Sequence, residues 1–236
     1  MGRDPRSAQY LEALGIESWV LRRPVPVALR TLPAPPLSPP GAAADWKELA
    51  AEVAACVRCR LRAGRTQTVF GVGDPHAELL VIGEAPGADE DRQGEPFVGR
   101  SGQLLNSMLF AAGFPRPSVY IANIIKCRPP DNREPLPEEV RCCMPYLQRQ
   151  IDLLAPRLML AVGRVAAQTL LATETPIGKL RGVVHRFGTG ATPLIVTYHP
   201  AYLLRSPREK RKAWDDLRFM RAELARRRDA ARSRSS

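Results

Sequence analysis

The sequence predicts an α/β protein in which helices cover both faces of a parallel sheet. Two observations lead to this prediction. Short apolar runs of strand length alternate along the chain with segments whose apolar residues recur at helical spacing. A polar residue or a glycine ends each apolar run, at Glu84, Asn123, Gly163 and His199. Because parallel strands end at one edge of their sheet, we expect these residues to share a site.

The elements follow one another from Asp45, a plausible N-cap residue for a first helix that would carry Cys56 to its end. Buried strands are expected at 78–83, 119–126, 158–163 and 193–200, where the chain reads ELLVIG, VYIANIIK, LMLAVG and PLIVTYHP. Helices are expected at 101–113, 137–156 and 164–172, and a further helix begins in the segment from 207 onward.

Three parts of the chain differ in composition. Residues 1–45 hold a short amphipathic piece, YLEALGIESWVLRR, followed by a proline-rich run that lacks the backbone donors for helix or sheet and is expected to be an extended linker. Residues 46–225 are expected to form the folded domain. Residues 226–236 are expected to be a basic, disordered tail, because charges of one sign crowd together there.

The charge balance favours a polyanionic partner. Lys and Arg number 35 against 24 Asp and Glu, which gives a formal net charge of +11. Such an excess suits nucleic acid or an anionic membrane surface, and charge alone does not choose between them. No run of eighteen apolar residues and no secretory signal is present in the sequence, so we expect a cytoplasmic protein that does not insert into membranes.

The five cysteines indicate a metal site. Cys56 and Cys59 are spaced so that both sulfurs can face one metal, while Cys127 and the pair Cys142 and Cys143 lie far along the chain. Four thiolates fit either zinc or a [4Fe-4S] cluster. Adjacent helical residues point about 100° apart, so only one of the pair should be a ligand. The alternative is that these cysteines are small buried hydrophobic residues.

An acidic, glycine-bracketed stretch, GEAPGADEDRQGEPFVG at 83–99, stands out in so basic a chain. Glu84 directly follows a buried strand and precedes the stiff turn Ala85-Pro86-Gly87, which is suited to the floor of a pocket. The acids at 89–91 could equally be a solvated loop or a helix cap. Phe97 could be an aromatic platform for a ligand or ordinary core.

Two further residues offer hydrogen-bonding groups. Asn123 interrupts an apolar strand, and its amide is the complement of an imide edge, although it could instead bond neighbouring backbone. His199, in YHPAYLLR, precedes a proline that fixes an extended backbone, and Arg205 follows it. A lone histidine is more often structural than catalytic.

Three segments, GEAPGADEDRQGEPFVGRSGQLLN, YIANIIKCRPPDNREPLPEEVRCCMPYL and YHPAYLLR, together resemble the family 4 uracil-DNA glycosylases over roughly residues 48–218. The resemblance implies a three-layer α/β/α fold with a central four-stranded parallel sheet, a [4Fe-4S] cluster, and excision of uracil from DNA. It further implies the cluster ligands Cys56, Cys59, Cys127 and Cys143. The catalytic residues would be Glu84 and His199, and the substrate-binding residues would be Gly83, Ala85, Gly87, Glu90, Phe97, Asn123 and Arg205.

Under this reading the protein is a DNA repair hydrolase, and its partner is uracil-containing DNA, single- or double-stranded, bound by a monomer. Glu84 would hold the attacking water, His199 would donate to uracil O2, and Glu90 would exclude the thymine methyl group. Phosphate contacts would come from Arg205 with Arg208, Lys210 and Arg211, and from the segment 126–133. The alternatives are a non-catalytic relative that binds damaged DNA and a nucleotide- or RNA-binding protein.

Overall fold

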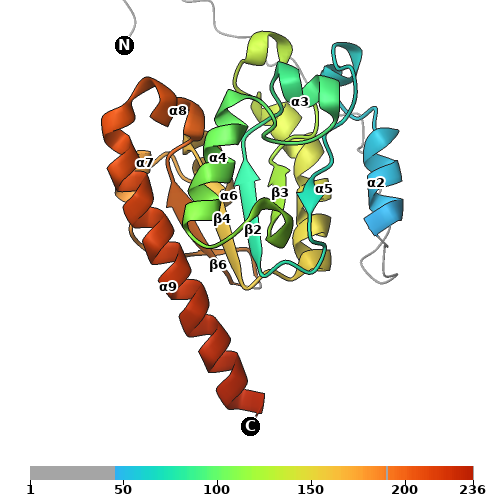
Figure 1. Ribbon diagram of the computed structural model, residues 1–236. Helices are drawn as coiled ribbons and strands as arrows, with labels where there is room; N and C mark the ends of the chain where they lie inside the picture. Colours follow the sequence, from blue (N-terminus) through green and yellow to red (C-terminus); the bar gives the residue numbers. More distant parts are fainter. Residues whose placement is uncertain (1–45, 190, 236) are drawn as a thin grey trace, which may run out of the picture. The chain divides into compact units, whose positions relative to one another are not determined.

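The computed structural model describes residues 46–189 and 191–235. The predicted extension 1–45 lies outside the described residues. A six-stranded sheet with the order β1-β3-β2-β4-β6-β5 forms the centre of this part of the chain (Figure 1). The strands are β1 (Val72–Gly73), β2 (Leu79–Gly83), β3 (Tyr120–Asn123), β4 (Leu158–Val162), β5 (His185–Phe187) and β6 (Thr192–Thr197). Strands β3, β2, β4 and β6 pair in parallel, which confirms the expected four-stranded parallel centre.

Two short edge strands were not predicted from the sequence. β1 pairs antiparallel with β3, and β5 pairs antiparallel with β6. Each is two or three residues long, so neither carries enough alternation to be recognised as a strand. They cover the edges of the parallel sheet and leave its buried centre in place.

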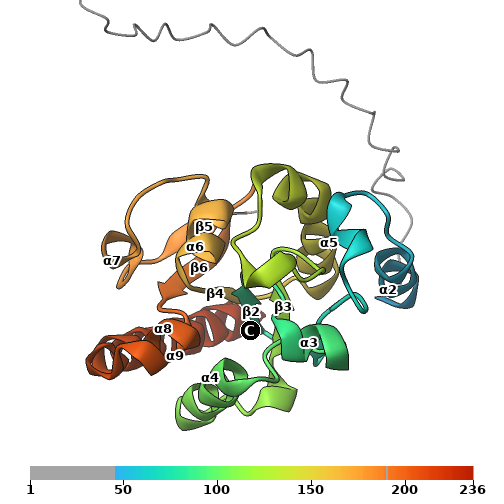
Figure 2. The same cartoon turned by 90° about the horizontal axis from the view of Figure 1, so that it is seen from above.

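Helices cover both faces of the sheet, as Figure 2 shows from above its carboxyl edge. One face carries α2 (Trp46–Ala54), α5 (Pro137–Leu154), α6 (Arg164–Leu171) and α7 (Ile177–Leu180), and the other carries α4 (Arg100–Ala111) and α9 (Lys210–Ser235). Short α3 (Ala88–Gln93) and α8 (Pro200–Arg205) and the 3-10 turns Arg60–Ala63, Arg116–Ser118, Pro130–Asn132 and Pro207–Glu209 complete the structure. The layers therefore match the predicted α/β/α architecture.

Alternating side chains of the parallel strands pack into two separate hydrophobic cores, one on each face of the sheet. In β2, Leu80 and Ile82 pack toward α5, while Leu79 and Val81 pack toward α4 and α9. Every residue of β2 and β4 is buried, as expected for strands that are covered on both faces. This burial explains why these strands were recognisable as continuous apolar runs.

The connections create a crevice at the carboxyl end of β2. The chain passes from β2 through α4 to β3 on one side, and then through α5 to β4 on the other side of β2. In open α/β sheets, ligands bind where the strand order reverses in this way. The fold therefore places a ligand crevice beside Glu84, which directly follows β2.

Two sequence expectations need correction. The first helix ends at Ala54, so Cys56 lies in the turn beyond it. The expected disordered tail from residue 226 is instead the continuation of α9 to Ser235. Its arginines do not simply repel one another, because Arg226 and Arg227 both pair with Glu223, and Arg228 pairs with Glu78. Among the described residues, no helix combines the length and apolar character that crossing a bilayer requires.

Candidate active site

A pocket of about 950 Å³ opens at the carboxyl ends of the parallel strands. Its wall includes Glu84 after β2, Asn123 at the end of β3, Gly163 after β4 and His199 after β6. The structure thus brings together the strand-end residues that the sequence singled out. Predicted binding residues that also line the pocket are Ala85, Gly87, Glu90, Phe97 and Arg205. Gly83 does not line it and lies against the Asn123 amide.

The Asn123 side chain is buried and has an unused acceptor. Asn123 pairs with Gly83 across the β2–β3 ladder and is 2% exposed. Its Oδ1 has no hydrogen-bond partner in the described structure. An unpaired buried acceptor costs about 1–3 kcal/mol. An arrangement of this kind is suited to an incoming ligand that supplies a donor.

Gly83 allows the amide and an aromatic ring to approach the strand closely. A Cβ atom at this position would lie 2.4 Å from Asn123 Oδ1 and 2.5 Å from Phe97 Cζ. Both distances are below van der Waals contact. The absence of a side chain at Gly83 therefore sets the positions of Asn123 and Phe97 in the pocket.

Phe97 adopts an unusual backbone conformation. Its φ angle is 55°, in the left-handed region, and the residue is 5% exposed. The ring centroid lies 5.7 Å from that of His199, with 32° between the planes. The surroundings hold this strained residue, since Arg116 donates to its carbonyl and Gly102 leaves the carbonyl just enough room.

His199 caps the N-terminus of α8 and is held in one tautomer. Its Nδ1 accepts a hydrogen bond of 3.1 Å from the backbone N–H of Ala201. The proton of the neutral ring must then be on Nε2. Burial is the main cause that lowers the pKa of His199 to about 4, and the positive charge of Arg205 contributes to the same shift. At neutral pH the ring is an uncharged Nε2–H donor.

Glu84 is a carboxyl group with an altered ionisation. Burial is the main cause that raises its pKa to about 7, and the negative charge of Glu134 adds to this effect. Arg164 opposes it by favouring the carboxylate form. Glu134 and Arg164 form an ion pair with each other on the pocket wall. Glu84 can therefore exchange a proton near neutral pH, as a group that activates water must.

The other acids of the loop have structural partners. Glu90 accepts hydrogen bonds from the backbone N–H groups of Gly87, Val98 and Gly99. Asp91, which the sequence suggested could be solvated, is 3% exposed and accepts from the Thr66 N–H through both oxygens. These carboxylates hold the turn before α3 and the segment after it in place.

The basic residues predicted to contact phosphates, here called the basic rim, include one that is buried. Arg205, Arg208, Lys210 and Arg211 are exposed, as phosphate contacts require. Lys126, which opened the predicted basic segment 126–133, is only 1% exposed and cannot contact a phosphate on the surface. Its burial follows from its place three residues after the end of β3, where its side chain reaches Gln150 of α5.

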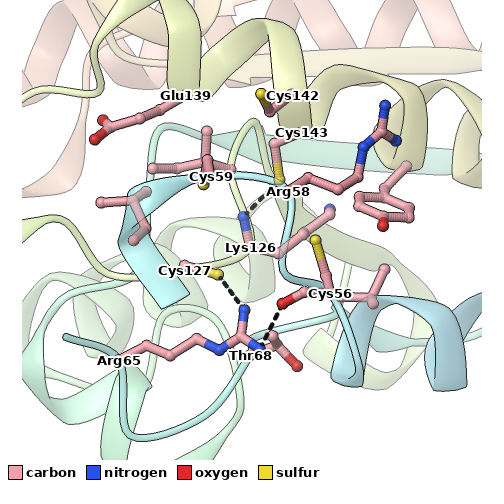
Figure 3. Close-up of a pocket in the computed structure, with 14 residues that line it drawn as sticks. Cys56, Arg58, Cys59, Arg65, Thr68, Lys126, Cys127, Glu139, Cys142 and Cys143 are labelled. Carbon is pink, nitrogen blue, oxygen red and sulfur yellow. Dashed lines mark hydrogen bonds between the residues drawn. The ribbon is translucent and has the colours of Figure 1, made fainter. Parts of the chain in front are cut away.

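All five cysteines line a second cavity, between α2, the end of β3 and α5. Figure 3 shows the sulfur atoms of Cys56, Cys59, Cys127 and Cys143 around a common space, with that of Cys142 pointing away. The fold thus brings together the four cysteines that the resemblance named as ligands. All five are free thiols, and burial raises the pKa of Cys143 to about 12.

Donors point at two of these sulfurs. The Arg65 guanidinium donates to Cys127 Sγ at 3.1 Å, and the backbone N–H of Lys126 donates to Cys143 Sγ at 3.2 Å. Within 46–189 and 191–235, no three His, Cys, Asp or Glu side chains are grouped as ligands for a metal ion. The cavity therefore holds sulfur atoms and hydrogen-bond donors, but its cysteines are not grouped as ligands of a single metal ion.

Sequence reasoning missed several residues that shape these sites. Glu134 and Arg164 face Glu84, and Arg65 contacts the cysteine cavity. Arg164 could have been found by the rule that selected Gly163, because it stands at the same strand end. Glu134 and Arg65 lie in loops with no periodic pattern, so the sequence held no comparable signal for them.

Comparison with known proteins agrees with this geometry. Residues 70–218 match the family model described as the uracil DNA glycosylase superfamily. This match spans most of the described domain, including the residues that line the pocket and two of the four cysteines around the common space, Cys127 and Cys143. Cys56 and Cys59 precede the matched segment. The chain belongs to the uracil-DNA glycosylase superfamily.

Within the superfamily, the similarity is to the type-4 enzymes. The type-4 uracil-DNA glycosylase of Archaeoglobus fulgidus is 42% identical over 178 residues, which cover 72% of this chain and 89% of the relative. That of Thermotoga maritima is 41% identical over 152 residues, 64% of this chain and 79% of the relative. A type-5 uracil-DNA glycosylase of Thermus thermophilus is 36% identical over 153 residues, 56% and 68%. These relatives confirm the resemblance to family 4.

Proposed function

We propose that this protein removes uracil from DNA by hydrolysing the N-glycosidic bond, leaving an abasic site. The observation that carries the proposal is a single pocket that holds three complementary groups. These are the unpartnered Oδ1 of Asn123, the neutral donor His199 and the carboxyl group of Glu84. The names of the type-4 relatives support the same reaction.

Uracil in a duplex is stacked and paired, so the nucleotide must leave the helix to reach the pocket, which costs a few kcal/mol. Exposed Arg205, Arg208 and Arg211 would offset this cost through phosphate contacts. A single strand avoids the unpairing cost. Uracil-containing DNA, single- or double-stranded, is therefore the proposed partner.

Base recognition would use the Asn123 amide and the Phe97 ring. Oδ1 would accept from uracil N3–H, and the amide nitrogen would donate to O4. Cytosine presents the opposite polarity at these two positions, so it would leave buried polar groups unpaired, which strongly disfavours it. Phe97 would stack on the base. Glu90 also lines the pocket, and its carboxylate already accepts hydrogen bonds from three backbone N–H groups. Glu90 would therefore hold the acidic loop in place in addition to its proposed contact with the C5 edge of the base.

Bond cleavage would use His199 and Glu84. As the C1′–N1 bond breaks, its electron pair leaves with uracil, and positive charge develops on the sugar. The Nε2–H of His199 would donate a hydrogen bond to uracil O2 and so stabilise the departing anion, while the imidazole ring itself is uncharged. The Glu84 carboxylate would stabilise the sugar cation and accept the proton of the water that attacks C1′.

We infer that the cysteine cavity holds a [4Fe-4S] cluster on Cys56, Cys59, Cys127 and Cys143. A cluster binds each thiolate through a different iron atom, so its ligands stand farther apart than those of one zinc ion. This suits sulfurs that surround a common space without forming a single-ion site. The donors from Arg65 and Lys126 suit anionic sulfur. When bound, the cluster would join the turn after α2 to α5 and to the end of β3.

Release of free uracil from uracil-containing DNA by the purified chain tests the reaction. The Glu84→Gln, Asn123→Ala and His199→Ala variants should each release uracil at least about a hundredfold more slowly, the usual range for lost general-base or anion-stabilising groups. Undiminished release by all three would refute the role assignment. A chain that binds uracil-containing DNA tightly and releases no uracil would instead be the non-catalytic relative.

A further inference from the structure

A lysine is buried in the wall between the two cavities. Lys126 is 1% exposed and is among the largest fully buried side chains of the described residues. It lines the cysteine cavity, and Figure 3 shows it among the sulfurs. Taking an ammonium group out of water costs several kcal/mol unless it is well compensated. The reaction proposed above assigns it no task.

The ammonium group has two strong hydrogen bonds and no carboxylate partner among the ion pairs of the described residues. Nζ donates to the backbone carbonyl of Asn123 at 3.0 Å and to Gln150 Oε1 at 2.6 Å. Gln150, which lies on α5, donates in turn to the Phe70 carbonyl at 3.0 Å. The charge is therefore fixed in place from two elements, and one of its partners is the residue that carries the unused Oδ1.

The backbone of the same lysine contacts the cysteine cavity. Its N–H donates to Cys143 Sγ at 3.2 Å, and its carbonyl accepts from the Val69 N–H at 2.8 Å. The next residue is Cys127. The segment 123–127 thus begins in the base pocket and ends in the cysteine cavity, and Lys126 is bonded toward both.

We propose that Lys126 is a positioning residue that holds the Asn123 amide in its recognition geometry and so couples the cysteine cavity to the base pocket. The proposal rests on the proposed function, because it assigns Asn123 to uracil recognition. Two observations support it. The ammonium bonds the Asn123 carbonyl. The Asn123 side chain lies close against Gly83, beside the position where the Phe97 ring tip also approaches that glycine, so a shift of the Asn123 backbone would change the place of Oδ1.

A double-mutant cycle separates positioning from plain stability. Lys126→Met keeps length and burial and removes the donors from the Asn123 carbonyl. We expect kcat/KM for uracil release from a single-stranded uracil-DNA to fall about tenfold, the effect of losing one hydrogen bond to a charged group. In the Asn123→Ala background, the same change should have almost no further effect, because the group that Lys126 positions is already absent.

The control is Leu147→Ala, which removes a buried side chain of α5 three residues before Gln150 and makes no bond to Asn123. Its effect should multiply with that of Asn123→Ala. Absorbance near roughly 400 nm, expected for an iron-sulfur centre, and circular dichroism are recorded for each variant. If Lys126→Met fails to fold or loses this absorbance, Gln150→Met takes its place, because it frees the ammonium from α5 without altering a neighbour of Cys127.

The outcomes distinguish the two proposals. Equal uracil release by the natural chain and Asn123→Ala would overturn the recognition role of Asn123, and with it the positioning role of Lys126, whereas a natural chain that releases no uracil would overturn the proposed function itself. If Asn123→Ala shows the expected defect, two results would overturn only the positioning role. In one, the effects of Lys126→Met and Asn123→Ala multiply. In the other, Lys126→Met is as active as the natural chain. A shared, non-multiplying loss would support it.

Discussion

Replacing Gly83 by alanine tests whether close approach at one strand position sets the geometry of the base pocket. The added methyl group would lie 2.5 Å from Phe97 Cζ and 2.4 Å from Asn123 Oδ1. An ordinary carbon–carbon contact is about 3.5 Å, so the ring tip must retreat by about 1 Å, and the amide by a similar amount. One methyl group would thus move both proposed recognition groups.

The expected loss follows from that displacement. A misplacement of about 1 Å can cost about a hundredfold in rate, whereas overpacking a core position costs about 1–3 kcal/mol of folding stability. We therefore expect kcat/KM for uracil release to fall about a hundredfold while the protein remains folded at assay temperature. Uracil release and denaturant unfolding measure the two effects separately.

Gly64→Ala is the matched control, because an added Cβ there would meet no atom within 4 Å and its φ of −113° suits any residue. This variant should keep full activity. A Gly83→Ala protein that releases uracil within about threefold of the natural rate would refute the reasoning, since the pocket would then tolerate displaced recognition groups.

Three further predictions follow from the ionisable groups. Uracil release should rise with pH through about 7, because Glu84 must lose its proton to act on water and its pKa is raised to about 7. In a pH–rate profile, Glu134→Gln should move this rise to lower pH and Arg164→Gln should move it to higher pH. An unmoved profile in both variants would contradict the role assigned to Glu84. His199 has a folded-state pKa of about 4 against an ordinary value of 6.5, so the unfolded chain binds the proton more readily and stability is lost as pH falls from 6.5 toward 4. The loss should reach about 2 kcal/mol at about pH 5 in urea unfolding and be absent in His199→Gln; equal acid sensitivity of the two proteins would show that another group is responsible. Cys143→Ala should lose the absorbance near roughly 400 nm while Cys142→Ala keeps it, and the reverse pattern would exchange their roles.

Much of the fold was predictable because its central strands are covered on both faces. Continuous burial forces β2 and β4 to be apolar throughout, so each is a recognisable run, and each run ends where the crevice opens. The strand-end residues Glu84, Asn123 and His199 were found for the same reason. The edge strands β1 and β5 are too short to impose a pattern, and the pairing of Glu223 with two arginines of α9 is invisible without the helix geometry.

The sequence by itself determined the order of elements, the residues at the strand ends and the cysteines available to the proposed cluster, since these depend on local periodicity and spacing. Only the tertiary structure decided which groups are buried and what they contact. In the structure, Lys126 is buried and bonds to the Asn123 carbonyl instead of lying on the basic rim. Glu90 and Asp91 accept hydrogen bonds from backbone N–H groups and hold the loop in place. Oδ1 of Asn123 has no partner among the described residues. The physical reason is that burial and hydrogen bonding depend on residues far apart in the chain, and these are brought together only when the sheet and its helices assemble.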